Sequence, residues 1–98
     1  MSRLELSLDA QHDLVEIAAH ITSQSGSQKR GEAFLSGVFA TCETLASQPA
    51  MGELRTEFVT GVYRSFSVGS YVIYFQPTPA GIVVARVLYG SRDHYSIL

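Results

Sequence analysis

The segment that most constrains the fold of this chain spans residues 61–93. It contains three runs rich in β-branched and aromatic residues, which cover residues 61–68, 71–75 and 82–89. Glycine separates the first two runs, and a short stretch with Pro77, Pro79 and Gly81 separates the last two. Short runs bounded by Gly and Pro and joined by brief connections predict three consecutive antiparallel strands.

Both faces of this predicted sheet are apolar. Strict alternation places Arg86 on one face with Ile82, Val84 and Leu88, and it places Arg64 on a similarly apolar face of the first run. The opposite faces are also far from polar. A sheet of this kind is expected either to be covered on both sides or to await a partner on one side.

The residues before the sheet predict an edge strand and a first helix. Residues 3–6 alternate polar and apolar side chains, as an edge strand does. Ser7 is a typical N-cap, and Asp9 follows in the first turn, where a negative charge meets the helix dipole. The buried stripe recurs at helical spacing through Ala10, Leu14, Ile17 and Ile21, and the helix is expected to end near Ser25-Gly26.

A second helix is predicted from just after Ser27 to about Ser47. Its apolar stripe consists of Phe34, Val38, Cys42 and Leu45. Gly31 and Gly37 weaken a helix but would let a neighbouring helix approach closely. Residues 48–52 end this helix, and residues 53–60 are interpreted as a polar connector that carries Glu53, Arg55 and Glu57.

The predicted class is therefore α+β, with a helical hairpin packed on a mainly antiparallel sheet in the order β-α-α-β-β-β. A chain of 98 residues is expected to form a single domain, residues 1–98. No apolar run approaches the roughly 20 residues needed to span a bilayer, and no signal sequence is recognisable. A single cysteine forms no internal disulfide, so a cytoplasmic location without membrane contact is expected.

The charge distribution favours a protein partner over nucleic acid. The net charge is −2, whereas nucleic-acid-binding domains usually carry a clear positive excess, so no direct specific DNA binding is expected. Residues 1–49 contain three basic and six acidic side chains, and residues 50–98 contain four basic and three acidic ones. All four basic groups of the second half are arginines, which pair well with carboxylates and phosphates.

Two candidate sites have simpler structural interpretations. His12, Glu16 and His20 recur every four residues, as metal ligands on one helical face would, but a solvated polar face is favoured. Cys42 lies in an apolar stripe, where a free cysteine behaves as a small hydrophobic residue. The glycines match no nucleotide-binding motif, and neither a cofactor nor a metal is expected.

The arginines of the strands are stronger candidates. Arg64 and Arg86 are costly to bury without an anion, so each is expected to face a ligand, to reach the rim of the sheet, or to be held by Glu53, Glu57 or a backbone carbonyl. A local salt bridge is predicted between Arg92 and Asp93.

The end of the chain leaves two alternatives open. Residues 91–98 form either a short helical turn or a tail. His94 and Tyr95 lie beside Arg92, and such a group could cleave RNA by acid/base catalysis with arginine stabilising the developing charge. The single lysine, Lys29, argues against a large anionic substrate.

Four motifs, in this order and spacing along nearly the whole chain, resemble the ParE toxins of the RelE/ParE toxin–antitoxin superfamily. They are Asp13-Leu14-x-Glu16-Ile17, Leu45-Ala46-x-x-Pro49-x-Met51-Gly52, Arg64-Ser65-Phe66-x-Val68-Gly69-x-Tyr71-Val72-Ile73-Tyr74 and Arg86-Val87-Leu88-x-Gly90-x-Arg92-Asp93.

The resemblance implies the same β-α-α-β-β-β fold and a toxin that causes growth arrest. It further implies that the toxin poisons DNA gyrase by trapping the cleaved DNA complex, and that a ParD-type antitoxin encoded beside it neutralises it. ParE proteins generally lack the catalytic residues of the RNA-cleaving RelE toxins. The Asp93-His94-Tyr95 sequence departs from this pattern, because some RelE-like nucleases end in a His-Tyr pair.

Three functions remain as hypotheses: a gyrase poison without catalysis of its own, a ribosome-dependent mRNA endoribonuclease, and an inert relative that only binds an antitoxin. The residues expected to bind the target or the antitoxin are Arg64, Tyr74, Arg86, Tyr89, Arg92 and Tyr95. For a nuclease, the catalytic group would be Arg64, Arg86, His94 and Tyr95. Apolar patches bordered by arginines suit an amphipathic acidic segment of an antitoxin.

Overall fold

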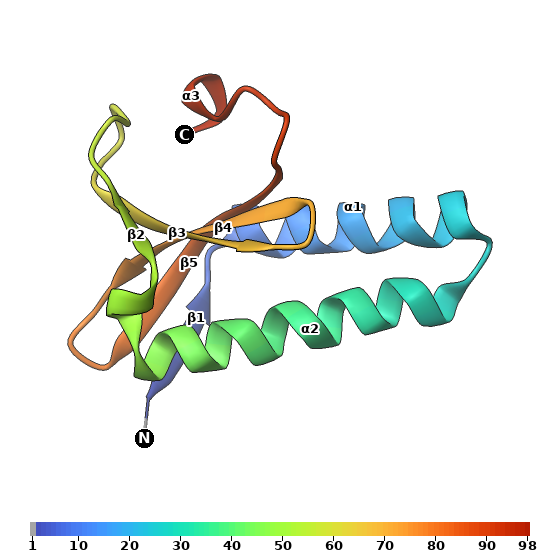
Figure 1. Ribbon diagram of the computed structural model, residues 1–98, viewed down its shortest axis with the longest axis horizontal. Helices are drawn as coiled ribbons and strands as arrows, with labels where there is room; N and C mark the ends of the chain where they lie inside the picture. Colours follow the sequence, from blue (N-terminus) through green and yellow to red (C-terminus); the bar gives the residue numbers. More distant parts are fainter. Residues whose placement is uncertain (1) are drawn as a thin grey trace.

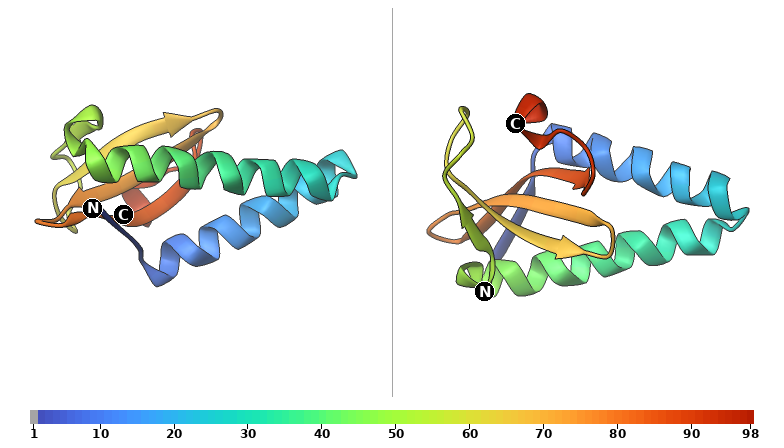
Figure 2. Two further views of the ribbon diagram at one scale, coloured as in Figure 1. Left: turned by 90° about the horizontal axis from the view of Figure 1, so that it is seen from below. Right: turned by 45° about the horizontal axis from the view of Figure 1, so that its top comes forward.

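The computed structural model describes residues 2–98 and shows a twisted sheet with a helical hairpin packed on one face (Figure 1). The hairpin consists of α1 (Leu8–Ser25) and α2 (Gln28–Ser47), and both lie on the same side of the sheet (Figure 2). The α+β class and the helical hairpin are therefore confirmed.

Helix α1 begins and ends where the sequence predicts. The Ser7 Oγ accepts a hydrogen bond from the Ala10 N–H at 3.0 Å, which satisfies one of the free donors of the first turn. Gly26 ends the helix with φ 68°, a left-handed conformation that glycine adopts without steric cost. Ala10 and Leu14 of the predicted stripe are buried against the sheet.

Helix α2 buries Val38, Cys42 and Leu45, as its stripe predicts. The two helices approach closely at Gly31, where a Cβ atom would lie 2.8 Å from the Ala18 carbonyl oxygen. The same role predicted for Gly37 is wrong, because a Cβ atom there would have no neighbour within 4 Å. Only the first of the two glycines is therefore needed for helix packing.

The sheet has five strands in the order β1-β5-β4-β3-β2. The strands are β1 (Arg3–Leu6), β2 (Glu53–Arg55), β3 (Tyr63–Val68), β4 (Tyr71–Pro77) and β5 (Gly81–Tyr89). All neighbours are antiparallel except β1, which runs parallel to β5. The predicted order β-α-α-β-β-β is confirmed.

Strand β2 was not predicted. It comes after the short 3-10 helix η1 (Pro49–Met51) and lies inside residues 53–60, which the sequence indicated as a connector. Three residues with a charge at each end give no recognisable alternation of buried and exposed side chains. The strand forms because β3 offers it a free edge, with Leu54 opposite Arg64.

A β-bulge in β5 changes which residues share a face. Tyr74 pairs with Arg86 but Phe75 pairs with Val84, so Ala85 is an extra residue in β5. An extra residue reverses the alternation of sides beyond it. Val84 therefore packs in the core under the helices, whereas Leu88 belongs to the cluster on the opposite face, and the predicted grouping of the two is wrong.

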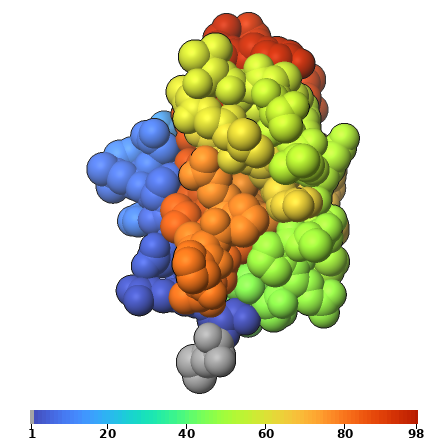
Figure 3. All heavy atoms as spheres, turned by 90° about the vertical axis from the view of Figure 1, so that its left-hand side faces the viewer, coloured from blue at the N-terminus to red at the C-terminus, as the bar shows by residue number. Residues whose placement is uncertain are grey.

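Both faces of the sheet are covered by the chain itself. The helices cover one face, and the cluster on the other face contains Phe58, Tyr63, Tyr74 and Leu88, with Ile97 and Leu98 packed against it. The covering segments are the loop between β2 and β3 and the C-terminal end, which includes α3 (His94–Ile97). The two segments lie side by side at one end of the molecule (Figure 3).

Candidate functional site

His94 links the C-terminal end of the chain to the sheet through hydrogen bonds of both ring nitrogens. Its Nε2 lies 2.9 Å from the Tyr89 carbonyl oxygen, and its Nδ1 lies 2.6 Å from the Tyr74 hydroxyl. A carbonyl oxygen only accepts, so Nε2 carries a proton, and in the neutral ring Nδ1 accepts from the tyrosine. The imidazole therefore connects β4, the end of β5 and α3.

Asp93 caps α3. Its carboxylate accepts a hydrogen bond from the Ser96 Oγ at 2.6 Å and a longer one from the Ser96 N–H, and these bonds lower the pKa of Asp93. Among residues 2–98 no ion pair joins Asp93 to Arg92, so the predicted salt bridge is wrong. The Ser96 hydroxyl and amide satisfy the carboxylate instead. Of the two alternatives for the end of the chain, the structure shows a helical turn, α3.

An aromatic and cationic group surrounds His94, and we name it the C-terminal cluster: Arg55, Phe58, Tyr74, His94 and Tyr95. The Phe58 ring packs edge-on against the Tyr74 ring, with 5.3 Å between the ring centres. The centre of the Tyr95 ring is also 5.3 Å from that of Phe58, with an angle of 40° between the ring planes. Tyr74 is fully buried, whereas Tyr95 is 66% exposed. The cluster thus extends from a rigid interior to the protein surface.

Arg55 supplies the charge of this cluster. Its guanidinium forms a salt bridge with Glu57 at 2.6 Å and lies 5.6 Å and 5.7 Å from the ring centres of Phe58 and Tyr74. The bond with Glu57 raises the pKa of Arg55, and the same bond lowers the pKa of Glu57. Burial raises the pKa of the Tyr74 phenol, so this hydroxyl stays protonated at neutral pH.

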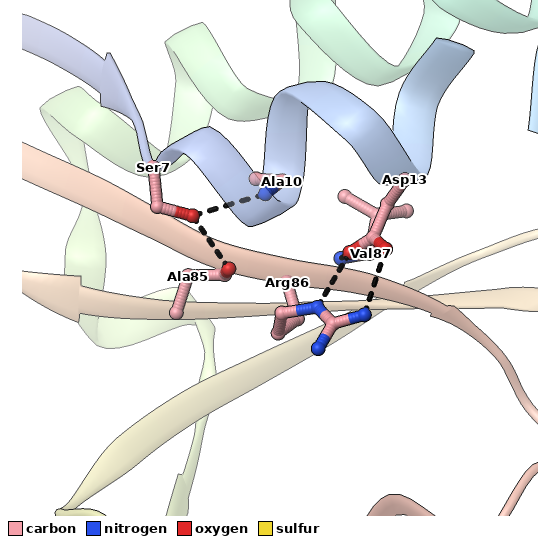
Figure 4. A network of polar contacts seen from close by, with 6 residues as sticks. All are labelled: Ser7, Ala10, Asp13, Ala85, Arg86 and Val87. Carbon is pink, nitrogen blue, oxygen red and sulfur yellow. Dashed lines mark hydrogen bonds and ion pairs between the residues drawn. The ribbon is translucent and has the colours of Figure 1, made fainter. Parts of the chain in front are cut away.

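A second polar network lies where β1 leaves β5 (Figure 4). The carboxylate of Asp13 binds the Nε and Nη2 atoms of Arg86 and also accepts the Val87 N–H. At the start of α1, the Ser7 hydroxyl donates to the Ala85 carbonyl at 2.7 Å. These side chains satisfy backbone groups of β5 that β1 no longer reaches.

Arg86 is therefore held internally, though by a different partner from those predicted. The sequence suggested Glu53, Glu57 or a carbonyl oxygen, and the partner is Asp13. The pKa of Arg86 is raised, mainly by this hydrogen-bonded pairing. Asp13 could have been found from its place in the buried stripe, three residues after Ala10 and directly before Leu14, where an acid needs a partner.

Arg64 is held by a backbone carbonyl, as one of the predicted alternatives states. Its Nη1 donates to the Gly52 oxygen at 2.8 Å. Arg64 pairs with Phe75, whose side chain lies in the core on the helix side of the sheet. His94 approaches Tyr74 on the opposite side. The four residues expected for a nuclease therefore do not converge on one site.

The residues expected to bind partners fall into separate groups. Tyr74 and Tyr95 belong to the C-terminal cluster, whereas Tyr89 and Arg92 line a groove of about 370 Å³ that we name the α1 groove. Its other wall is formed by α1 through Asp13, Glu16, Ile17 and His20, and its floor by Tyr71 and Val87. Sequence reasoning missed Arg55 and Phe58, because a connector gives no periodic signal.

The two sites with simpler interpretations lie on an exposed face of α1 and in the core, respectively. His12, Glu16 and His20 are exposed on α1, and no group of three potential metal ligands is assembled within residues 2–98. Cys42 is fully buried, and burial raises the pKa of its thiol to about 11. A thiol in this environment is unreactive at neutral pH.

The chain matches a known protein family. Residues 4–94 match a family described as the ParE toxin of the type II toxin–antitoxin system, parDE. The match covers both long helices and strands β2 to β5 in full. The chain belongs to the ParE toxin family. It is thus the toxin of a type II toxin–antitoxin system, and its implied partner is an antitoxin.

No match was found among curated proteins. Among residues 2–98, no helix has the length and apolarity required to cross a membrane.

Proposed function

We propose that this toxin acts by binding DNA gyrase and trapping the cleaved DNA complex, and that a ParD-type antitoxin neutralises it. The observation that carries this proposal is that three of the four residues expected for RNA cleavage are engaged in hydrogen bonds within the toxin. Arg64, Arg86 and His94 are each held by hydrogen bonds within the chain. A toxin whose candidate catalytic groups serve the fold is better suited to act by binding.

The surface around the C-terminal cluster supports a protein target. Tyr95 is 66% exposed and Val59 fully exposed, at the end of the molecule where the loop before β3 meets the C-terminal segment. Exposed aromatic side chains on a rigid base are typical anchors of protein interfaces. The net charge of −2 favours a protein surface over free nucleic acid. This surface is the proposed gyrase contact.

The antitoxin is proposed to occupy the α1 groove and the adjacent sheet. On this proposal the two partners bind different parts of the toxin, the antitoxin at the α1 groove and gyrase at the C-terminal cluster. On this proposal the chain works as one toxin domain in the cytoplasm, where gyrase and DNA are found, and growth arrest results from blocked replication.

The deciding experiment is a supercoiling assay with purified gyrase, ATP and the folded toxin, scored for both inhibition and double-strand breaks. Inhibition with accumulated cleaved DNA supports the proposal. A large excess of folded toxin without effect would remove gyrase as the target. Cleavage of ribosome-bound mRNA, lost on replacing His94 or Tyr95 in a folded variant, would establish the nuclease alternative.

The antitoxin is tested separately by co-expressing the toxin with the protein encoded beside it. Expression of the toxin alone is expected to arrest growth, and co-expression is expected to restore growth and yield a complex that co-purifies. A toxin that arrests growth but is not rescued would contradict the antitoxin assignment and leave the gyrase assignment standing.

A further inference from the structure

The outer edge of β5 is open beside the α1 groove. Pairing with β1 ends at Leu6 opposite Val84. On the other side of β5, the Gly90 N–H donates to Ser70, and Val72 and Tyr71 lie opposite Leu88 and Tyr89. Because bonded and non-bonded pairs alternate in an antiparallel ladder, the backbone groups of residues 87 and 89 point away from β4 and toward this edge.

Two of these four edge groups are occupied and two are free. The Val87 N–H donates to Asp13 at 3.0 Å, and the Tyr89 carbonyl accepts from His94 and from the Arg92 N–H. The hydrogen bonds of residues 2–98 give the Val87 carbonyl and the Tyr89 N–H no partner. Val87 and Tyr89 both line the α1 groove, so an acceptor and a donor face it.

The pattern of free groups selects the direction of an incoming strand. An antiparallel residue bonds to the N–H and the C=O of one and the same residue, and here each residue has one of the two already taken. A parallel residue placed opposite Leu88 instead bonds to the C=O of residue 87 and the N–H of residue 89. These are the two free groups. The parallel direction is also that of β1.

We propose that a short extended segment of the antitoxin adds to the edge of β5 in the α1 groove and runs parallel to β5. This inference rests on the proposed function and states how the antitoxin is held there. Edge pairing of this kind supplies affinity through the backbone, and side-chain pockets supply specificity.

The groove defines the chemistry of that segment. The rings of Tyr71 and Tyr89 lie 5.5 Å apart edge-on and form an aromatic surface suited to an apolar side chain. On one side Glu16 is exposed, and on the other side Arg92 is exposed. Neither side chain has an ion-pair partner among residues 2–98. The segment is therefore an apolar residue flanked by a base for Glu16 and an acid for Arg92.

The test measures amide exchange by NMR in the free toxin and in its complex with the protein encoded beside it. The Tyr89 amide, free in the toxin alone, is expected to exchange at least about tenfold more slowly in the complex, as a hydrogen-bonded edge amide does. The Val87 amide serves as an internal standard, because Asp13 already protects it in the free toxin.

Charge reversal supplies a second measurement. Arg92→Glu is expected to weaken the complex by roughly fivefold, the range of exposed charge pairs. Arg30→Glu is the matched control, since Arg30 is also exposed but lies on α2 outside the groove, and it is expected to leave affinity unchanged.

The possible outcomes separate this inference from the proposed function. A stable complex in which the Tyr89 amide still exchanges at the free rate would overturn the edge pairing and leave the antitoxin assignment intact. Failure to form any complex would overturn the antitoxin assignment, and the edge pairing with it. Slowed exchange together with the Arg92→Glu effect supports both.

Discussion

The carboxylate of Asp13 holds the guanidinium of Arg86 by two hydrogen bonds of 2.8 Å each. The two residues are 73 positions apart in the sequence, and their side chains are 8% and 21% exposed. The same carboxylate also accepts the Val87 N–H, so it connects α1 to the strand whose edge β1 has left. Arg86 is thereby a structural residue, which makes Arg92 the better position for testing partner contacts.

Removing the carboxylate is expected to destabilise the toxin strongly. Asp13→Ala leaves a largely buried guanidinium without a counter-charge and an amide without an acceptor, which should lower the free energy of unfolding by about 3 kcal/mol. Urea denaturation followed by circular dichroism measures this loss. Glu16→Gln, one turn later and exposed, should change stability by less than about 0.5 kcal/mol. Equal effects of the two substitutions would refute the structural role of the pair.

Two N-cap serines are expected to respond differently to the same substitution. Ser7 bonds both the Ala10 amide and the Ala85 carbonyl, whereas Ser27 makes no side-chain capping bond at α2. Ser7→Ala should therefore cost about 1–2 kcal/mol, and Ser27→Ala should be close to neutral. Thermal and urea unfolding of both variants provides the comparison. A larger loss at Ser27 would contradict the capping geometry.

Gly37 offers a stabilising substitution. A Cβ atom at this position in α2 meets nothing within 4 Å, so Gly37→Ala is expected to stabilise the toxin by about 0.5–1 kcal/mol through reduced chain entropy. Gly31→Ala in the same helix should instead destabilise it, because its Cβ would press against the Ala18 carbonyl. The unfolding midpoints of both variants are compared with that of the unsubstituted toxin. A loss of stability in Gly37→Ala would contradict the open space around this position.

Cys42 makes stability depend on alkaline pH. Its pKa is about 11 in the folded state against 9.0 for a thiol exposed to water, so between these values the unfolded chain releases the proton first. The contribution of Cys42 is therefore present below pH 9 and is lost as pH rises, by about 1 kcal/mol at pH 10. Urea unfolding at pH 7–10 should show a steeper decline for the native toxin than for Cys42→Ala. Parallel declines would exclude this linkage.

Tyr95 is expected to be a contact for the proposed gyrase target. It is 66% exposed and its ring contacts Phe58, so Tyr95→Ala should preserve the fold while raising the toxin concentration needed for gyrase inhibition by roughly tenfold. Phe39→Ala, which removes an exposed aromatic ring from α2, is the control and should leave inhibition unchanged. If Tyr95→Ala inhibits gyrase as strongly as the unsubstituted toxin, Tyr95 is not part of the gyrase contact.

Local patterns in the sequence were sufficient for the helices and the long strands. The apolar stripe from Ala10 and the Ser7 and Gly26 signals define α1, because helical periodicity and capping act within a few residues. The β-branched and aromatic runs define β3, β4 and β5 for the same reason. The two apolar sides of the sheet left open whether the chain covers both faces or one face awaits a partner, and the structure shows the first alternative.

Two of the errors in the sheet share one physical cause. Strand β2 exists because β3 offers an open edge, and the bulge at Ala85 changes the side on which Leu88 lies. Neither event is determined by the residues that immediately surround it. The expected Arg92–Asp93 pair fails for a local reason instead, because Asp93 caps α3 and its carboxylate accepts hydrogen bonds from Ser96.

The sequence by itself thus determined the family, the two helices, the three long strands and the apolar character of the sheet, since these depend on short-range periodicity. The tertiary structure decided which polar groups meet. Asp13 reaches Arg86, His94 reaches Tyr74, and the edge of β5 stays open beside α1. Such contacts join residues far apart in the chain, and a buried charge or amide is satisfied only by whatever partner the completed fold brings within hydrogen-bond distance.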